Sequence, residues 1–250
     1  MPGTLTYFIS DLHLGARYIA EPREHEMRVV RWLDSIKHNA KHIFLLGDIL
    51  DYWYEYRYVV PRGHVRFLGK LAELADSGVE ITWMTGNHDI WLFDYLSSEL
   101  GIKVVDGPLK LTLDGKTFLL DHGDGVGRQK RSFAFMRQLF RNRFCQMLYA
   151  GIHPRWTVPL ANGWSKENRV KRSAADIERC IAHGLKALTD FSEEYSKCNP
   201  EVDYFVYGHL HTLIDDTLST GKRMLVLGEW IGMCTYAVFD GNELMLKSAL

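Results

Sequence analysis

The sequence lacks the features of several protein classes. Its four cysteines, at positions 145, 180, 198 and 234, form no C-x-x-C pair, which argues against a disulfide framework and a thiolate zinc site. We therefore expect a reducing, cytoplasmic compartment. No apolar run approaches the roughly 20 residues needed to cross a bilayer. No basic segment precedes an apolar stretch at the N-terminus, so a signal peptide is not expected.

The chain also has almost no net charge. Its 30 Lys and Arg residues oppose 31 Asp and Glu residues, which gives a formal net charge of −1. Binding of nucleic acid through bulk positive charge is therefore not expected. With 250 residues, 46% of them hydrophobic, the chain can bury a full core. We predict a single domain over residues 1–250.

The charge is unevenly distributed along the chain. Residues 125–175 contain eleven Lys and Arg residues and a single acidic residue, Glu167, whereas the remainder is acidic. This basic segment is also rich in Phe, Leu and Met, and we predict that it is largely helical. One interpretation is a solvated helix that packs on the body by an apolar face. The other is a site for an anionic, partly apolar ligand, such as a phospholipid head group or a lipid-linked nucleotide.

Short apolar strands alternate with helical segments, and five of the strands end in polar clusters. The clusters are Asp11/His13, Asp48/Asp51, Asn87/His88/Asp89, His122/Asp124 and His209/His211. In open α/β sheets, ligands bind at the carboxyl ends of strands, because the loops there converge. We therefore predict an α/β fold in which these side chains share one crevice.

The residue types in these clusters indicate a metal site. Carboxylates and imidazoles without a thiolate are the donor set of Mn²⁺, Fe²⁺, Zn²⁺ or Mg²⁺, of which we expect Mn²⁺. The donors suffice for two divalent ions about 3.5–4 Å apart that share one carboxylate. Such a pair activates a bridging hydroxide for in-line attack at phosphorus. The clusters thus predict phosphoester chemistry at a site for two ions.

The five clusters also match a known set of motifs. The ordered set D-x-H, G-D-x-x-D, G-N-H-D, H-G-D and G-H-x-H runs from Asp11 to His211 and resembles the calcineurin-like metallophosphoesterases. The resemblance implies a four-layer α/β/β/α sandwich with a dinuclear metal centre. By this match the ligands of the first ion are Asp11, His13, Asp48 and His211, and those of the second are Asp48, Asn87, His122 and His209. It also implies that His88 stabilises charge or protonates the leaving oxygen, and that Asp89 orients His88.

Within this superfamily the chain resembles the UDP-2,3-diacylglucosamine diphosphatases of lipid A synthesis. The shared features are the chain length, residues 10–15, 47–53 and 122–124, and a helical insert before the last motif. The resemblance implies that a lipid-linked UDP-sugar is hydrolysed to UMP and 2,3-diacylglucosamine 1-phosphate, with the insert over about 125–175 as a lid on the acyl chains. It implies a cytoplasmic enzyme bound peripherally to the anionic surface of the inner membrane. We expect no obligate protein partner and no nucleic acid partner.

The sequence also offers candidate substrate contacts, and two alternative functions remain open. Asp124, Ser165, Lys166 and Asn168 are the candidates for contacting the substrate, and Ser165 and Lys166 also fit a helix cap. One alternative function is a soluble phosphoesterase acting on nucleotides or phosphoproteins. Another is a non-catalytic scaffold on the same fold, which would have lost metal ligands. No ligand of the motif set is missing, so we expect an enzyme.

Overall fold

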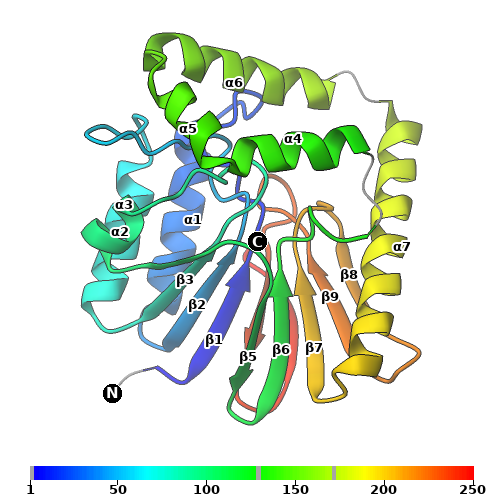
Figure 1. Cartoon of the computed structure of the whole chain (residues 1–250). Coiled ribbons are helices and arrows are strands. Elements are labelled where there is room, and N and C mark those ends of the chain that lie inside the picture. The colour runs from blue at the N-terminus through cyan, green and yellow to red at the C-terminus, as the bar shows by residue number, and fades with distance from the viewer. Residues whose placement is uncertain (1–2, 128–130, 171–172) are drawn as a thin grey trace.

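The computed structural model describes residues 3–127, 131–170 and 173–250, which form two mixed β-sheets (Figure 1). The first sheet contains β1 (Leu5–Ile9), β2 (Ala40–Leu46), β3 (Glu80–Met84), β4 (Lys103–Val105), β10 (Thr235–Phe239) and β11 (Leu244–Ser248). The second contains β5 (Leu109–Leu113), β6 (Lys116–Asp121), β7 (Val202–Tyr207), β8 (Leu213–Thr217) and β9 (Arg223–Leu227). Their strand orders are β11-β10-β1-β2-β3-β4 and β5-β6-β7-β9-β8.

Helices cover the outer faces of both sheets (Figure 1). The first sheet carries α1 (Pro22–Ile36), α2 (Val65–Asp76) and α3 (Tyr95–Leu100), and the second carries α7 (Ala174–Cys198). Helix α1 buries Val29, Leu33 and Ile36, which are spaced three or four residues apart. This spacing places them on one helix face, which packs on the sheet.

The inner faces of the two sheets pack against each other through aromatic side chains. Phe8 of β1, Phe44 of β2 and Phe118 of β6 are fully buried. The ring of Phe8 stacks on Phe44 at 5.2 Å and on Phe118 at 5.6 Å between centroids. Because side chains alternate along a strand, Phe8 faces the second sheet while Tyr7 and Ile9 face the helices. The expected four-layer α/β/β/α sandwich is confirmed.

The strand directions bring the polar clusters to one edge of the sandwich. Strands β1, β2 and β3 are parallel, as are β6, β7 and β9, and their carboxyl ends lie at the same edge (Figure 1). Three helices of the basic segment lie across this edge: α4 (Arg131–Arg141), α5 (Arg143–Ala150) and α6 (Pro154–Val170). The expected helical character of this segment is confirmed over these ranges.

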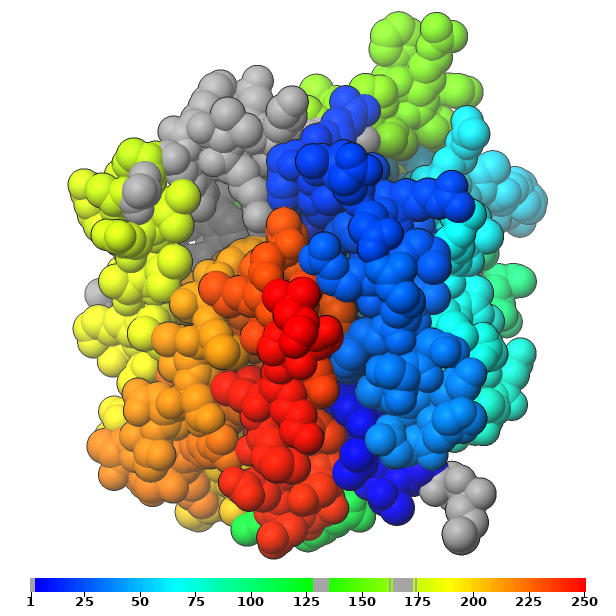
Figure 2. Space-filling view, turned by 180° about the vertical axis from the view of Figure 1, so that it is seen from behind, coloured from blue at the N-terminus to red at the C-terminus, as the bar shows by residue number. Residues whose placement is uncertain are grey.

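Strands β10 and β11 return the end of the chain to the first sheet. Figure 2 shows the C-terminal segment (red) beside the N-terminal part of the chain (blue), as the pairing of β10 with β1 requires. Strands β4 and β8 were not expected, because β4 has three residues and β8 is a largely exposed edge strand without apolar alternation. Among the described residues, no helix is both long enough and apolar enough to span a membrane.

Candidate metal centre

The polar residues that follow the strands share an unusual backbone conformation. Among the described non-glycine residues eight have a positive φ, and five of them belong to the clusters: Asp11, His13, Asp48, His209 and His211. Their φ values lie between 46° and 69°. This left-handed conformation is uncommon outside glycine, although Asp and His adopt it more readily than most residues, and it concentrates at functional sites. The chain therefore turns sharply after β1, β2 and β7, at the edge where the clusters meet.

Two buried carboxylates connect the strand ends through hydrogen bonds with backbone N–H groups. Asp11 Oδ2 accepts a hydrogen bond of 2.9 Å from the backbone N–H of His209, which joins the end of β1 to the end of β7. Asp48 Oδ1 accepts one of 2.9 Å from the backbone N–H of His88, which joins the end of β2 to the loop after β3. A Cβ atom on Gly208 would lie 2.6 Å from Asp11 Oδ2, so this close approach requires glycine.

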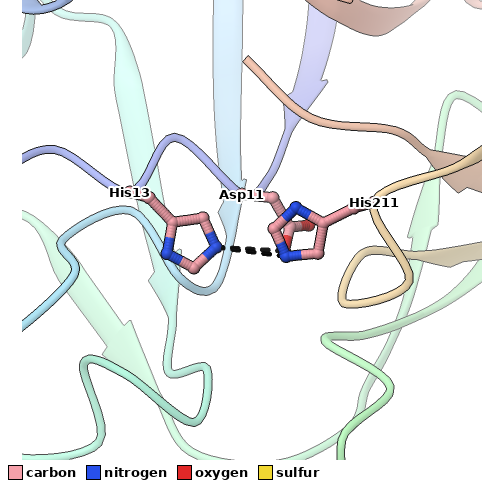
Figure 3. Close-up of side chains that lie close together, drawn as sticks. All are labelled: Asp11, His13 and His211. Atoms are coloured by element: carbon pink, nitrogen blue, oxygen red, sulfur yellow. Dashed lines mark hydrogen bonds and ion pairs between the residues drawn. The ribbon is translucent and has the colours of Figure 1, made fainter. Parts of the chain in front are cut away.

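The other oxygen of each carboxylate faces imidazole nitrogens. Asp11 Oδ1 lies 3.4 Å from Nε2 of His211, and Asp48 Oδ2 lies 3.4 Å from Nε2 of His122. His13 lies between the two carboxylates, with Nε2 3.8 Å from Asp11 Oδ1 and 3.7 Å from Asp48 Oδ2. Figure 3 shows His13 and His211 directing their Nε2 atoms toward each other beside Asp11, at 3.2 Å. Donor atoms from both sheets therefore converge on one small region.

Three buried atoms of this cluster make no hydrogen bond: Asp11 Oδ1, Asn87 Oδ1 and His122 Nε2. His122 Nδ1 lies 2.8 Å from the carbonyl oxygen of Leu46, which can only accept, so Nδ1 donates there and Nε2 faces the centre. Buried polar atoms without partners are costly unless a ligand satisfies them. Carboxylate, amide and imidazole donors without a thiolate fit a divalent cation of the Mn²⁺, Fe²⁺ or Zn²⁺ type.

The electrostatics of the centre also favour a cation beside Asp48. Burial raises the pKa of Asp48, but His122 and His88 outweigh burial and hold this pKa well below its ordinary value. Burial lowers the pKa of His122, but Asp48 outweighs burial and raises it well above its ordinary value. Both shifts arise from attraction between an ionised Asp48 and positive charge next to it. A divalent cation would attract the Asp48 carboxylate in the same way and would take the place of the proton on the His122 imidazole.

The described donor atoms fall into three groups of three, and the atoms of each group lie within 4.8 Å of one another. The groups are Asp11, His13 and His211; Asp48, His122 and His209; and His13, Asp51 and His88. The first two groups lie within the two ligand sets that the motifs imply. The third adds Asp51, which belongs to the G-D-x-x-D motif but had no expected role. Its Oδ1 lies 3.1 Å from Nδ1 of His13 and 3.4 Å from Nδ1 of His88.

Asp89 does not orient His88 as the sequence suggested. Its two carboxylate oxygens receive five N–H donors at 2.7–3.5 Å: the backbone N–H groups of Asp48, Ile49, Leu50 and Gly86, and the indole of Trp83. His88 Nδ1 instead donates to the carbonyl oxygen of Asp51 at 3.0 Å. Asp89 therefore holds the loop that presents Asp48, and Asp51 is the residue that positions His88.

Part of the positive charge of the basic segment is paired with acids of the body. Arg137 Nε lies 3.1 Å from Oδ2 of Asp124, whose side chain is only 3% exposed. Arg141 lies 3.2 Å from Asp106. Asp124, a candidate substrate contact, is thus engaged by the segment itself. The other candidates, Ser165, Lys166 and Asn168, lie in α6, and their side chains fall outside the described part of the chain.

Aromatic residues of the body attach the helical segment in addition to these ion pairs. The Tyr54 hydroxyl donates to the carbonyl oxygen of Gln146 at 2.6 Å, and the Trp91 indole donates to that of Phe140 at 2.8 Å. The ring of Trp91 also packs on Tyr149 at 4.9 Å between centroids. Sequence reasoning missed this attachment, although the dense run of aromatic residues over 52–58 was visible.

A four-layer sandwich with buried Asp and His donors at its strand ends defines a protein suited to bind divalent cations. The family model of the calcineurin-like phosphoesterases matches residues 5–213. A protein of Porphyromonas gingivalis named UDP-2,3-diacylglucosamine hydrolase is 48% identical, over 97% of this chain and 96% of that protein. One of the same name from Ralstonia nicotianae is 28% identical, over 90% of this chain and 83% of that protein.

Among solved structures, Yfce, a phosphoesterase from E. coli, superposes with a TM-score of 0.48 at 15% identity, covering 98% of this chain and 93% of that one. The family model spans most of this chain, and the Porphyromonas relative covers nearly all of it. The chain belongs to the calcineurin-like phosphoesterase family and is a metal-dependent phosphoester hydrolase.

Proposed function

We propose that this enzyme hydrolyses the diphosphate of UDP-2,3-diacylglucosamine to UMP and 2,3-diacylglucosamine 1-phosphate. The observation that carries the proposal is the near full-length similarity to the Porphyromonas relative of that name. The composition of the site supports the same substrate. Divalent cations held by the Asp and His centre would bind a diphosphate, and large apolar side chains exposed on α5 and α6 suit acyl chains.

Two divalent ions, Mn²⁺ in our proposal, would be held by the residues that the motifs imply. Asp11, His13, Asp48 and His211 would hold one ion, and Asp48, Asn87, His122 and His209 the other, with Asp48 shared. Bound ions supply Lewis-acid stabilisation of the phosphoryl oxygens and an activated water. The chain contributes the fixed geometry. Backbone N–H groups hold one oxygen of Asp11 and one of Asp48, which leaves the other oxygen of each for metal.

Two observations support a role of His88 at the phosphate rather than as a metal ligand. Its Nδ1 donates to the carbonyl oxygen of Asp51, so Nε2 is the nitrogen that faces the centre, 3.9 Å from Asp48 Oδ2. Its side chain is 24% exposed, whereas that of His13 is fully buried. In this position His88 stabilises charge that develops on the phosphoryl oxygens or protonates the leaving oxygen.

Helices α5 and α6 would form the lid over the acyl chains and the contact with an anionic membrane. Phe144, Met147, Trp156 and Leu160 are 64–75% exposed, an unusual density of large apolar side chains on a surface. Arg143 lies next to Phe144 and Arg155 next to Trp156, and both are exposed. Apolar side chains flanked by cations suit the interface of an anionic bilayer. This arrangement supports a peripheral position at the inner membrane.

The metal assignment is tested with Asp48→Ala, which removes the shared carboxylate. We expect the variant to lose both ions and turnover, because each ion loses the negatively charged ligand that the two share. We expect it still to fold, because the other ligands and the strands that carry them are unchanged. Metal content per chain is measured by plasma mass spectrometry, with Asp76→Ala, at an exposed position of α2, as the control. An Asp48→Ala protein that retains two ions would refute the assignment.

The substrate is tested with the double variant Phe144→Ser/Trp156→Ser and with two substrates. We expect KM for UDP-2,3-diacylglucosamine to rise about tenfold or more, because two acyl contacts are lost, and hydrolysis of bis-p-nitrophenyl phosphate to stay unchanged. Leu213→Ser/Met233→Ser removes exposed apolar side chains elsewhere and is the control. Equal turnover of a UDP-sugar without acyl chains would overturn the proposed substrate and favour a soluble nucleotide phosphoesterase.

A further inference from the structure

A cavity lined by arginines adjoins the metal centre. It has a volume of about 340 Å³ and lies between the loop after β1, the loop before α2, and α6, which contributes Val158. Figure 1 shows α6 passing over the loop that leads from β1 into α1. Leu14 and Tyr52, in the cavity wall, directly follow His13 and Asp51 of the metal centre. The cavity and the metal centre therefore share two segments of chain.

Three arginines line this cavity: Arg23 in the first turn of α1, Arg62 in the loop before α2, and Arg66 in the first turn of α2. Within the described part of the chain, none of them forms an ion pair with a carboxylate. The single acid in the wall is Glu26, and its Oε1 already accepts the backbone N–H groups of Arg66 and Phe67 at 3.2 and 3.1 Å. The cavity wall therefore contains three arginines and one carboxylate, and that carboxylate is held by backbone N–H groups.

The wall beneath the arginines has a defined shape. His64 has a φ of 59°, a left-handed conformation that is rare outside glycine. Its ring packs over Gly15, where an added Cβ would lie 2.9 Å from the imidazole. The buried ring of Trp53 also lies near it, at 6.4 Å between centroids. A strained residue held by such packing gives the cavity a fixed wall.

We propose that this cavity binds a phosphate group through Arg23, Arg62 and Arg66. Guanidinium groups bind phosphate through paired, charge-assisted hydrogen bonds. Three arginines and one glutamate leave a net charge of +2 in the wall, which matches the charge of about −2 on a phosphate monoester. A volume of about 340 Å³ is at the lower end for small-molecule sites, so it admits a phosphate with a substituent attached. The phosphate belongs either to a soluble monoester such as UMP or to a phospholipid head group. The site is separate from the metal ligands and does not depend on the proposed substrate.

The proposal is tested by binding measurements on the metal-loaded enzyme and on the variant Arg23→Gln/Arg66→Gln. The probes are inorganic phosphate and UMP in calorimetry, and phosphatidylcholine vesicles with and without phosphatidylglycerol in co-sedimentation. Arg31→Gln/Arg179→Gln removes two exposed arginines outside the cavity and is the control for net charge. All three proteins keep the metal centre, so phosphate that binds there contributes equally to each measurement. A difference in affinity among the three proteins therefore comes from the cavity.

We expect the cavity variant to bind at least one probe about tenfold more weakly than the wild type and the control, because two charge-assisted contacts are lost. Loss of phosphate and UMP binding identifies a soluble monoester as the ligand. Loss confined to phosphatidylglycerol vesicles identifies a lipid head group. Equal affinity of all three proteins for every probe overturns the proposal. Arg62→Gln, a single exposed change, repeats the test if the double variant unfolds, and binding is read whether or not UDP-2,3-diacylglucosamine is hydrolysed.

Discussion

Replacement of Asp89 by Asn tests whether the hydrogen bonds of this carboxylate hold the loops of the metal centre in position. The carboxylate of Asp89 is fully buried, and its neighbours are N–H donors from three parts of the chain: residues 48–50 after β2, Trp83 in β3, and Gly86 after β3. Burial and the charge of Asp48 raise the pKa of Asp89. Five donors nevertheless require an acceptor at both oxygens, which the ionised form provides.

The hydrogen bonds of Asp89 give the size of the expected loss in the free energy of unfolding. Oδ1 receives the N–H groups of Asp48 and Gly86, and Oδ2 receives those of Ile49, Leu50 and Trp83. Whichever oxygen becomes the NH₂ of asparagine, at least two buried donors then face another donor. Each buried donor without a partner costs roughly 1–3 kcal/mol, so we expect Asp89→Asn to lower the free energy of unfolding by about 4 kcal/mol.

Urea unfolding gives the free energy, and plasma mass spectrometry gives the metal content of the same protein. We expect both to fall in Asp89→Asn, because the displaced loop carries Asp48. Asp76→Asn, at an exposed site, is the matched control and should stay within about 0.5 kcal/mol of the wild type. If Asp89→Asn unfolds like the control and loses only kcat, Asp89 acts on His88 as the sequence first suggested, and our reasoning is refuted.

Two further predictions concern a glycine and a histidine. Gly208→Ala should weaken Mn²⁺ binding about 10–100-fold in a metal titration, because its Cβ would displace Asp11, whereas Gly69→Ala, in open space on α2, should not. Burial and Lys103 lower the pKa of His42 to about 4, so the unfolded chain binds more protons than the folded chain below about pH 6.5. In urea unfolding, the wild type should therefore lose about 2 kcal/mol more than His42→Gln between pH 7 and pH 5; equal losses would contradict the assignment.

Those features of the centre that depend on short segments could be predicted from the sequence. Asp11 and His13 follow a strand, as do His209 and His211, and the carboxyl ends of parallel strands must meet at one edge. A local pattern and a rule of sheet geometry therefore suffice to bring these donors together. The sequence pattern does not fix the relative position of the two strand ends, which depends on the hydrogen bond from the backbone N–H of His209 to Asp11.

Features that depend on contacts between distant segments could not be predicted. Asp89 lies next to His88 in sequence, yet the five donors that surround it come largely from another strand end, and adjacency gave no sign of them. The arginines of the cavity beside the metal centre lie on α1 and on the loop and helix some forty residues later. In the sequence they appear as ordinary surface cations. The packing of α1 against α2 brings them together.

The basic segment needs two explanations for its charge rather than one. Asp124 is buried, and an unpaired buried carboxylate is costly, so its partner Arg137 is needed to attach α4 to the body. Arg141 is likewise engaged by Asp106, whereas Arg143 and Arg155 are exposed beside apolar side chains. An exposed ion pair contributes only about 0–1 kcal/mol, so pairing does not account for cations that lie on the surface. Ion pairs with Asp124 and Asp106 account for Arg137 and Arg141. The exposed Arg143 and Arg155 are the cations that, in our proposal, meet an anionic membrane surface.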